Sequence, residues 1–175
     1  GNGAAMRAAP VGLARAGDLE ALRLDAALSA LPTHADGLAI ASAASMAFAA
    51  AYLLRTPSGE LDPDDFVHSI VRCLDGIPDA GHRERRDGAG DRRVRLAERI
   101  AELPDLLDLP WQEAMQRTWN GAFVLESLPA AFWFFLAYRD DPEEAIVRAA
   151  SAGFDADTVA AMTGNLVGAY HGLEA

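Results

Sequence analysis

The feature that most constrains the fold is a run of 17 residues, 38–54, that carries no charged side chain. A run of this length is close to the lower limit of about 17–25 residues for a membrane-spanning helix. Ala and Ser dominate it, however, and the large aliphatic side chains that favour insertion into lipid are few. A helix without a polar face needs neighbours on every side. The run therefore predicts a buried core helix, and we expect no association with membranes.

Charge and composition exclude several classes of protein. The chain of 175 residues has 26 acidic residues and 15 basic ones, all of them Arg, and a net charge of −11. This charge disfavours general binding to nucleic acid or to anionic lipid. The single cysteine, Cys73, excludes an intramolecular disulfide framework and a zinc site built from cysteines. We see no secretory signal peptide and expect a cytoplasmic protein.

Helix signals recur along the chain, whereas strand signals are scarce. Asp18, Asp62 and Asp141 each stand where a carboxylate can cap a helix, and a proline follows directly after the last two. The predicted helices cover residues 19–31, 63–74 and 142–152, the apolar run to about residue 55, and a segment that starts near residue 158. We expect residues 1–175 to form a single all-α domain, a compact helical bundle.

Three glycines stand at intervals of four in the last predicted segment: Gly164, Gly168 and Gly172. Glycine costs about 1 kcal/mol relative to alanine inside a helix, so three of them on one face need a compensating gain. The close approach of another backbone supplies such a gain, because glycine has no Cβ. We expect another helix to lie against this face.

Residues 79–95 form a charged segment of a different kind. Seven of the fifteen arginines fall between residues 83 and 99, among four acidic residues, and the sequence Gly88-Ala89-Gly90 lies between them. An anion-binding or partner-binding patch would explain this charge. A solvated, mobile connection also explains it and is the interpretation we favour.

The stretch with the most chemistry is the turn before the last helix, at residues 153–158. Asp155 and Asp157 place two carboxylates one residue apart, and Thr158 adds a hydroxyl. Three oxygen ligands from a short turn suit a hard divalent cation such as Mg²⁺ or Mn²⁺. Helix capping by one of the two carboxylates is the alternative, because Asp is also a preferred N-cap residue.

Four segments, taken together and in order, resemble the ADP-ribosylglycohydrolase family. Residues 153–172, G-F-D-A-D-T-V-A-A-M-T-G-N-L-V-G-A-Y-H-G, resemble the family's Gly-Gly-Asp-Thr-Asp-Thr turn and the helix that follows it. Residues 1–10, G-N-G-A-A-M-R-A-A-P, resemble its glycine-rich ligand loop, and residues 33–34 its Thr-His pair. Residues 120–131, with N-G followed by E-S-L-P-A-A, resemble a fourth motif. The four segments together span nearly the whole chain.

The resemblance implies an all-helical hydrolase that uses two Mg²⁺ or Mn²⁺ ions to cleave the glycosidic bond between ADP-ribose and a protein side chain. Asp155, Asp157 and Thr158 would form the C-terminal half of the metal site. The groove for ADP-ribose would be lined by Gly1, Asn2, Gly3, Ala4, Met6, His34, Asn120 and Gly121. The expected partners are ADP-ribose or an ADP-ribosylated protein.

The family's Thr-Asp-Asp metal motif and its acidic catalytic residue match no segment here. The resemblance therefore implies that both lie upstream, that residues 1–175 are the C-terminal part of a larger domain, and that the N-terminal half is a further partner. Phe154 replaces a Gly of the turn motif, which predicts a strained backbone, and Ala156 replaces a Thr. A catalytically inactive member that binds ADP-ribose or has a structural role is the alternative function.

Several of these residues also have a simpler structural interpretation. His34 could bind a neighbouring carbonyl, and residues 120–121 could form a turn between two helices. Among the aromatic side chains, Trp111 and Trp119 could stack on adenine. Those at residues 132–135 could do so as well, but we expect them in the core.

Overall fold

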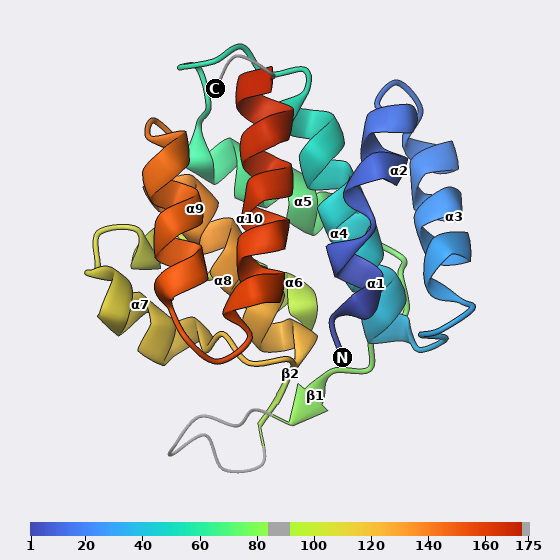
Figure 1. The fold of residues 1–175 in the computed structure, drawn as a ribbon. Coiled ribbons are helices and arrows are strands. Elements are labelled where there is room, and N and C mark those ends of the chain that lie inside the picture. Colours follow the sequence, from blue (N-terminus) through green and yellow to red (C-terminus); the bar gives the residue numbers. More distant parts are fainter. Residues whose placement is uncertain (84–91, 173–175) are drawn as a thin grey trace.

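The computed structural model describes residues 1–83 and 92–172, and within these ranges helices are the dominant secondary structure (Figure 1). The α-helices are α1 Gly3–Met6, α2 Ala9–Ala14, α3 Leu19–Ala30, α4 Gly37–Leu53, α5 Pro63–Cys73, α6 Leu96–Ala101, α7 Trp111–Thr118, α8 Val124–Ala137, α9 Pro142–Ser151 and α10 Ala156–His171. The other elements are a 3-10 turn, η1 Pro104–Leu106, and two short strands, β1 His82–Arg83 and β2 Arg93–Val94. The prediction of an all-α fold is confirmed.

Helix α4 is the centre of the fold. Its N-cap Asp36 accepts a hydrogen bond from the Ala39 amide at 3.0 Å, and most of its residues are buried. Helices α1, α2, α3, α5, α8 and α10 all contact it, which is why it can lack a polar face. The prediction of a buried core helix is confirmed, and none of the helices in the described ranges is long and apolar enough to cross a membrane.

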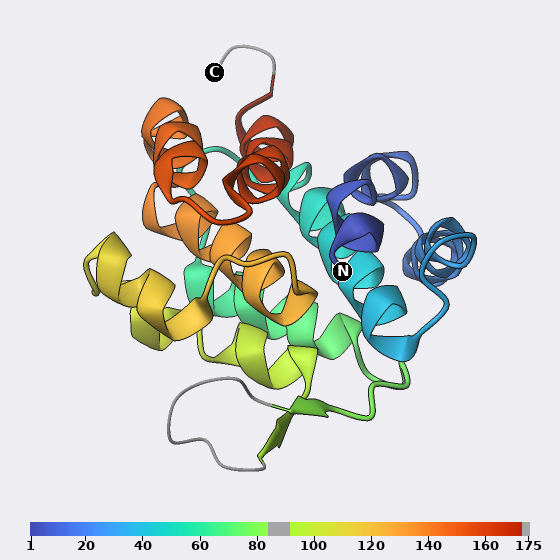
Figure 2. The same cartoon turned by 60° about the horizontal axis from the view of Figure 1, so that its bottom comes forward.

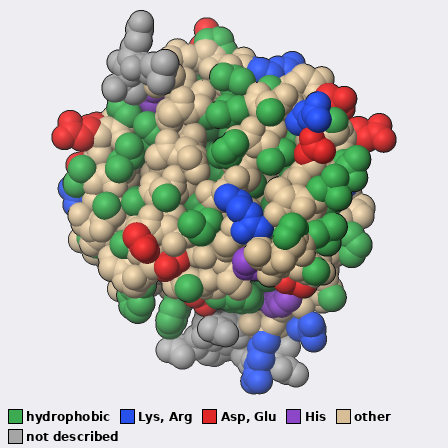
Figure 3. Space-filling model, turned by 45° about the vertical axis from the view of Figure 1, so that its right-hand side comes forward, with side chains coloured by type: hydrophobic (Ala, Val, Ile, Leu, Met, Phe, Trp, Pro, Cys, Tyr) green, Lys and Arg blue, Asp and Glu red, His purple; other side chains and the backbone are tan. Residues whose placement is uncertain are grey.

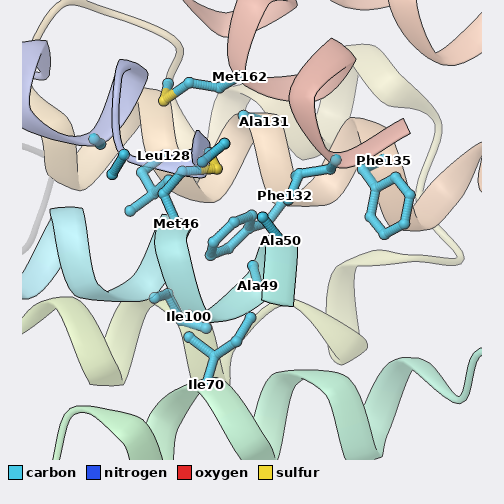
Figure 4. Packing of buried hydrophobic residues seen from close by; sticks show 14 of the residues in the cluster. Met46, Ala49, Ala50, Ile70, Ile100, Leu128, Ala131, Phe132, Phe135 and Met162 are labelled. Carbon is cyan, nitrogen blue, oxygen red and sulfur yellow. The ribbon is translucent and has the colours of Figure 1, made fainter. Parts of the chain in front are cut away.

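Helix α8 is the second buried helix and carries the larger side chains of the core. Figure 4 shows Met46 of α4 beside Leu128 and Phe132 of α8, with Ile70 of α5 and Ile100 of α6 on the opposite side of α4. Alanines on α4 let the two helices approach, and the aromatic side chains of α8 fill the remaining space. Helix α10 packs against both of these helices, so they fix the position of the turn that precedes it.

The predicted caps hold the outer helices as expected. Asp18, Asp62 and Asp141 each accept a hydrogen bond from a backbone N–H in the first turn of α3, α5 and α9, at 2.9–3.0 Å. Each of these helices ends within one residue of its predicted end. Local capping chemistry was therefore enough to place these three helices.

The charged segment over residues 79–95 is only partly described. Strands β1 and β2 pair antiparallel, with His82 opposite Val94 and Arg83 opposite Arg93. The sequence did not predict this pair, because two residues are too few for an alternating pattern. Residues 84–91 lie outside the described residues, so the predicted mobility of the connection stays a prediction.

Helix α3 carries apolar side chains on both of its faces. Leu22 and Ala26 are buried, whereas Leu24 and Leu28 are 59% and 53% exposed. Figures 1 and 2 show α3 at the edge of the molecule, and Figure 3 views this side, where hydrophobic side chains lie interspersed with charged ones. The predicted association of the chain with an N-terminal half stays a prediction.

The prediction that glycines of the last helix lie against another backbone is wrong. In the part of the chain that the structure describes, a Cβ built on Gly164 or Gly168 meets no atom within 4 Å, and Gly172 follows α10 with a φ of +76°. The close approach occurs instead between α2 and α4, where a Cβ on Gly12 would lie 1.9 Å from the Ala47 carbonyl oxygen. A spacing of four places residues on one face of a helix but does not tell which way that face points.

Alanine substitutions at two helical glycines should change stability in opposite directions. Gly12→Ala places a methyl group against the Ala47 carbonyl and should lower the free energy of unfolding by about 1–3 kcal/mol. Gly164→Ala is the matched control, and it should raise the free energy of unfolding by up to about 1 kcal/mol, because its site has open space. Urea unfolding followed by circular dichroism measures both. Equal effects would contradict the assignment of the close approach to Gly12.

Candidate metal turn and ligand site

The first residues of the chain contact the turn at residues 153–158, which leads into α10 and is called the acidic or metal turn below. Asn2 is only 8% exposed, and its side-chain amide donates to Ser127 Oγ at 3.0 Å and to Asp155 Oδ2 at 2.5 Å. Figure 1 shows the N-terminus at the same end of the bundle as the start of α10. One buried amide therefore joins three of the four motif segments. The sequence placed Asn2 and Asp155 in one site, but it gave no role to Ser127.

The two carboxylates of the turn have different surroundings. Asp155 is the residue before α10 and is partly buried; its carboxylate does not cap the helix but accepts from Asn2. Asp157 lies in the first turn of α10 and is exposed; its Oδ1 accepts from the Thr158 amide at 2.9 Å. The Asp155 carboxylate therefore does not cap the helix. One oxygen of Asp157 does accept from a free N–H of the first turn, as the capping interpretation expects.

Asn120 fixes the backbone of this turn. Its side chain donates to the carbonyl oxygens of Gly153 at 2.7 Å and Ala152 at 3.3 Å. Its own carbonyl accepts from the Asp155 amide at 3.1 Å, and the residue is 3% exposed. The amide donors of Asn120 are thereby directed at the turn.

Gly121 lies beside Glu126, since a Cβ there would be 2.5 Å from Glu126 Oε2.

The backbone of the turn is strained where the sequence predicted strain. Gly153 has a φ of +75°, which glycine adopts freely, and Phe154 has a φ of +55°. A side chain with a Cβ is uncommon in this left-handed region. The Phe154 side chain is 86% exposed and makes no compensating core contact. Contacts from Asn120 hold the chain on both sides of Phe154 in this conformation.

The ring of His34 lies against the N-terminal segment, and its assignment as a ligand-binding residue stays a prediction. A Cβ on Gly3 would be 2.8 Å from His34 Cε1, so only glycine lets the ring approach this closely. The ring nitrogen Nδ1 lies 2.8 Å from Thr33 Oγ1. The His34 backbone N–H donates to the Ala30 carbonyl at 2.8 Å, so the residue combines a backbone bond to a carbonyl with a side-chain contact to a hydroxyl.

The remaining residues of the N-terminal segment divide between core and surface. Ala4 is fully buried and faces the core, whereas Gly1 and Met6 are exposed. Arg7, to which the sequence gave no separate role, donates to Thr33 Oγ1 at 2.6 Å and to the Ser29 carbonyl at 2.8 Å. This side chain fixes α1 to the end of α3 and so places the segment beside His34.

The oxygen atoms of the turn suit a hard divalent cation but do not complete a site. Asp155 and Asp157 offer carboxylate oxygens and Thr158 a hydroxyl, which are ligands that Mg²⁺ and Mn²⁺ accept. Among the residues that the structure describes, no group of three or more His, Cys, Asp or Glu side chains is placed to hold a metal ion. A metal site at this turn therefore stays a prediction.

The aromatic residues of α8 belong to the core, as expected. Trp133, Phe134 and Phe135 are fully buried, and Trp133 Nε1 donates to the Leu106 carbonyl at 2.8 Å. They are therefore not placed to stack on a ligand at the surface.

A pocket opens beside the turn. The sequence had connected residues 111, 119, 120 and 121 with ADP-ribose, but it did not predict that Phe154 lies beside them. It has a volume of about 700 Å³ and lies between α7 and the segments at residues 119–121 and 152–154. Trp111, Trp119 and Phe154 line it, and the latter two are exposed. Residues so distant in sequence carry no shared local pattern, so only the fold brings them together.

Comparisons with known proteins identify the family of this chain. The ADP-ribosylglycohydrolase family model matches residues 1–175, and the chain belongs to this family. The chain is 31% identical to the Escherichia coli uncharacterized protein YegU and 30% identical to the human ADP-ribosylhydrolase ARH3, in each case over 99% of this chain and 51% of the relative. A protein of Archaeoglobus fulgidus is 30% identical over 95% of this chain and 48% of its own length. The chain thus spans about half the length of these relatives.

Removing the Asn2 amide should destabilise the protein. Asn2→Ala leaves the Asp155 carboxylate and the Ser127 hydroxyl without this donor, and the free energy of unfolding should fall by about 1.5–3 kcal/mol. Asn165→Ala is the matched control, because that amide makes only a 3.5 Å contact with the Met6 carbonyl at an exposed site. Its effect should stay within about 0.5 kcal/mol. Chemical denaturation measures both variants, and a neutral Asn2→Ala would show that the amide does not hold the turn.

Proposed function

We propose that this chain is part of a metal-dependent hydrolase that cleaves the glycosidic bond between ADP-ribose and a modified protein side chain. The observation that carries the proposal is the buried Asn2 amide, bound to both Ser127 and Asp155. This contact brings the glycine-rich segment that resembles a ligand loop against the carboxylate that resembles a metal ligand. Membership in the family and the name of the human relative, an ADP-ribosylhydrolase, support the same activity.

Asp155, Asp157 and Thr158 are the residues that would hold divalent metal, and two Mg²⁺ or Mn²⁺ ions are proposed. When bound, such ions offset negative charge and lower the pKa of a coordinated water. This chain's own residues contribute by position: Asn2 orients the Asp155 carboxylate, and Asn120 fixes the backbone that carries it. We assign no general acid or base to a residue of this chain.

The N-terminal segment and its neighbours would bind ADP-ribose. The diphosphate and ribose are proposed to bind at this segment, where Gly1 and Met6 are exposed and the ring of His34 lies against Gly3. Backbone N–H groups near glycine can approach phosphate oxygens closely. Asn120 and Gly121 stay the proposed neighbours of adenosine, and both line the pocket beside α7. The side chain of Asn120 is bound to the turn, so this residue would contact adenosine through its backbone.

A second candidate function is a member of the family that binds ADP-ribose without cleaving it. The strained backbone at Phe154, directly before Asp155, favours this possibility. Phe154 replaces a glycine of the turn motif that carries the proposed metal-ligating side chains, and this change can weaken metal binding. Isothermal titration calorimetry with ADP-ribose separates the two functions. Binding without release of ADP-ribose from any modified protein, with Mg²⁺ or Mn²⁺ present, would support the second.

The proposed metal turn predicts a selective loss of activity. In the intact protein, Asp157→Ala should reduce the release of ADP-ribose from a modified protein by at least about 100-fold, and a chelator should do the same to the unchanged protein. Asp140→Ala is the control, because that carboxylate is also exposed and lies outside the turn. Release of ADP-ribose, followed by liquid chromatography, is the measurement. An unchanged rate in Asp157→Ala or in chelator would end the proposal.

A further inference from the structure

A different pocket lies at the opposite end of the bundle from the acidic turn. It has a volume of about 500 Å³, and its walls come from the turn between α2 and α3, the beginning of α3 and the end of α4. Figure 1 shows the turn between α2 and α3 at the top of the molecule, whereas the N-terminus and the start of α10 lie lower down. The residues that line this pocket lie outside the acidic turn and outside residues 1–10. The pocket is therefore separate from the site of the proposed function.

The inner wall of this pocket is apolar. Leu22 and Ala51 line it and are almost fully buried, with 2% and 4% of their surface exposed, and the rings of Phe48 and Tyr52 line it as well. The Tyr52 hydroxyl donates to Asp65, and burial raises the pKa of Tyr52 to about 12, so this ring is uncharged at neutral pH. An apolar group that enters the pocket is removed from water against these side chains, which favours its binding.

Two arginines line the same pocket and give it a positive charge. Arg15 belongs to the turn after α2, and Arg55 follows the end of α4; both side chains are exposed. Among the described residues that line the pocket, none is acidic, although the chain has 26 acidic residues and 15 basic ones. Arginines gathered in a hollow with apolar walls attract anions. The lining therefore favours a ligand that has a negatively charged group.

The protein holds both guanidinium groups in place and leaves donors for a ligand. Arg15 Nε donates to Asp25 Oδ2 at 2.7 Å, and Arg55 Nη1 donates to the Ala16 carbonyl at 3.1 Å. A guanidinium has five N–H donors, and two of them can bind one carboxylate side by side. Asp25 and Asp18 offset part of the charge of Arg15. Arg55, whose contact is to a neutral carbonyl, is therefore the stronger anion-binding group.

We propose that this pocket binds a small organic acid, with its carboxylate at Arg55 and its apolar body against Leu22 and Phe48. The volume suits such a ligand, because small-molecule sites occupy about 300–1,000 Å³. The inference goes beyond the proposed function, since it concerns other residues and holds whether or not the acidic turn is catalytic. The apolar body is either an alkyl chain or an aromatic ring, and the test below distinguishes the two.

The test is isothermal titration calorimetry of the intact protein with octanoate and with 3-phenylpropionate, in about 0.1 M salt so that distant charges are screened. At least one of the two acids should bind saturably, and the tighter one identifies the apolar body. Acetate lacks that body and should give no measurable binding, because each buried methylene group contributes up to about 4-fold in affinity. Octan-1-ol lacks the charge and should bind at least about 3-fold more weakly than octanoate.

Substitutions of Arg55 test the role of its charge. Arg55→Gln keeps much of the side chain but removes the charge, and it should weaken binding of the acid by about 5- to 50-fold, between the values for exposed and buried charged contacts. Arg55→Lys keeps the charge and should bind at least about 3-fold more tightly than Arg55→Gln. Arg72→Gln is the matched control on α5, outside the pocket, and should change the affinity by less than about 2-fold.

The outcomes separate the proposal from its alternatives. Failure of both acids to bind, or equal affinity for octanoate and octan-1-ol, would overturn it. Equal losses in Arg55→Gln and Arg55→Lys would also overturn it, because Arg55 would then act only through its bond to the Ala16 carbonyl. An equal loss in Arg72→Gln would show a general effect of charge and would contradict a site at Arg55. Binding of the acid by a protein that releases no ADP-ribose leaves this proposal standing while the proposed function falls.

Discussion

The site depends on one buried amide. Asn2 donates from its side chain to Ser127 and to Asp155, so the beginning of the chain, the first turns of α8 and the start of α10 are held within hydrogen-bonding distance. A hydrogen bond to a carboxylate is stronger than one between neutral groups, and here it is largely removed from water. This bond links the glycine-rich segment directly to the acidic turn.

Around this contact, the fold works as a rigid support. The buried helix α4 lies at the centre of the bundle, and α8 presents Ser127 and follows the segment in which Asn120 binds the turn. Arg7 and His34 place the N-terminal segment from the other side. The acidic turn is therefore bound by the side chains of Asn2 and Asn120, from two separate regions, which is the preorganisation that a metal or ligand site requires.

The sequence predicted those features that depend on neighbouring residues. Caps such as Asp18 and Asp141 placed helices, the uncharged run placed the core helix, and the glycine missing at Phe154 predicted the strained turn. Prediction from the sequence failed for features that depend on the direction in which a helix face points, or on which segments distant in sequence come into contact. The spacing of Gly164 and Gly168 could not show that their face is open, and nothing local joins Trp119 to Phe154 across the pocket.

The central claim is that the turn carrying Asp155 and Asp157 binds a divalent cation in the arrangement that Asn2 holds. Crystals of the intact protein grown or soaked with Mn²⁺ test it most directly, because manganese is located by its anomalous scattering. The account predicts an anomalous peak within about 2.0–2.3 Å of carboxylate oxygens of both Asp155 and Asp157, a range set by the metal–oxygen distances of small divalent cations. Mn²⁺ bound elsewhere, with none at this turn, would contradict it.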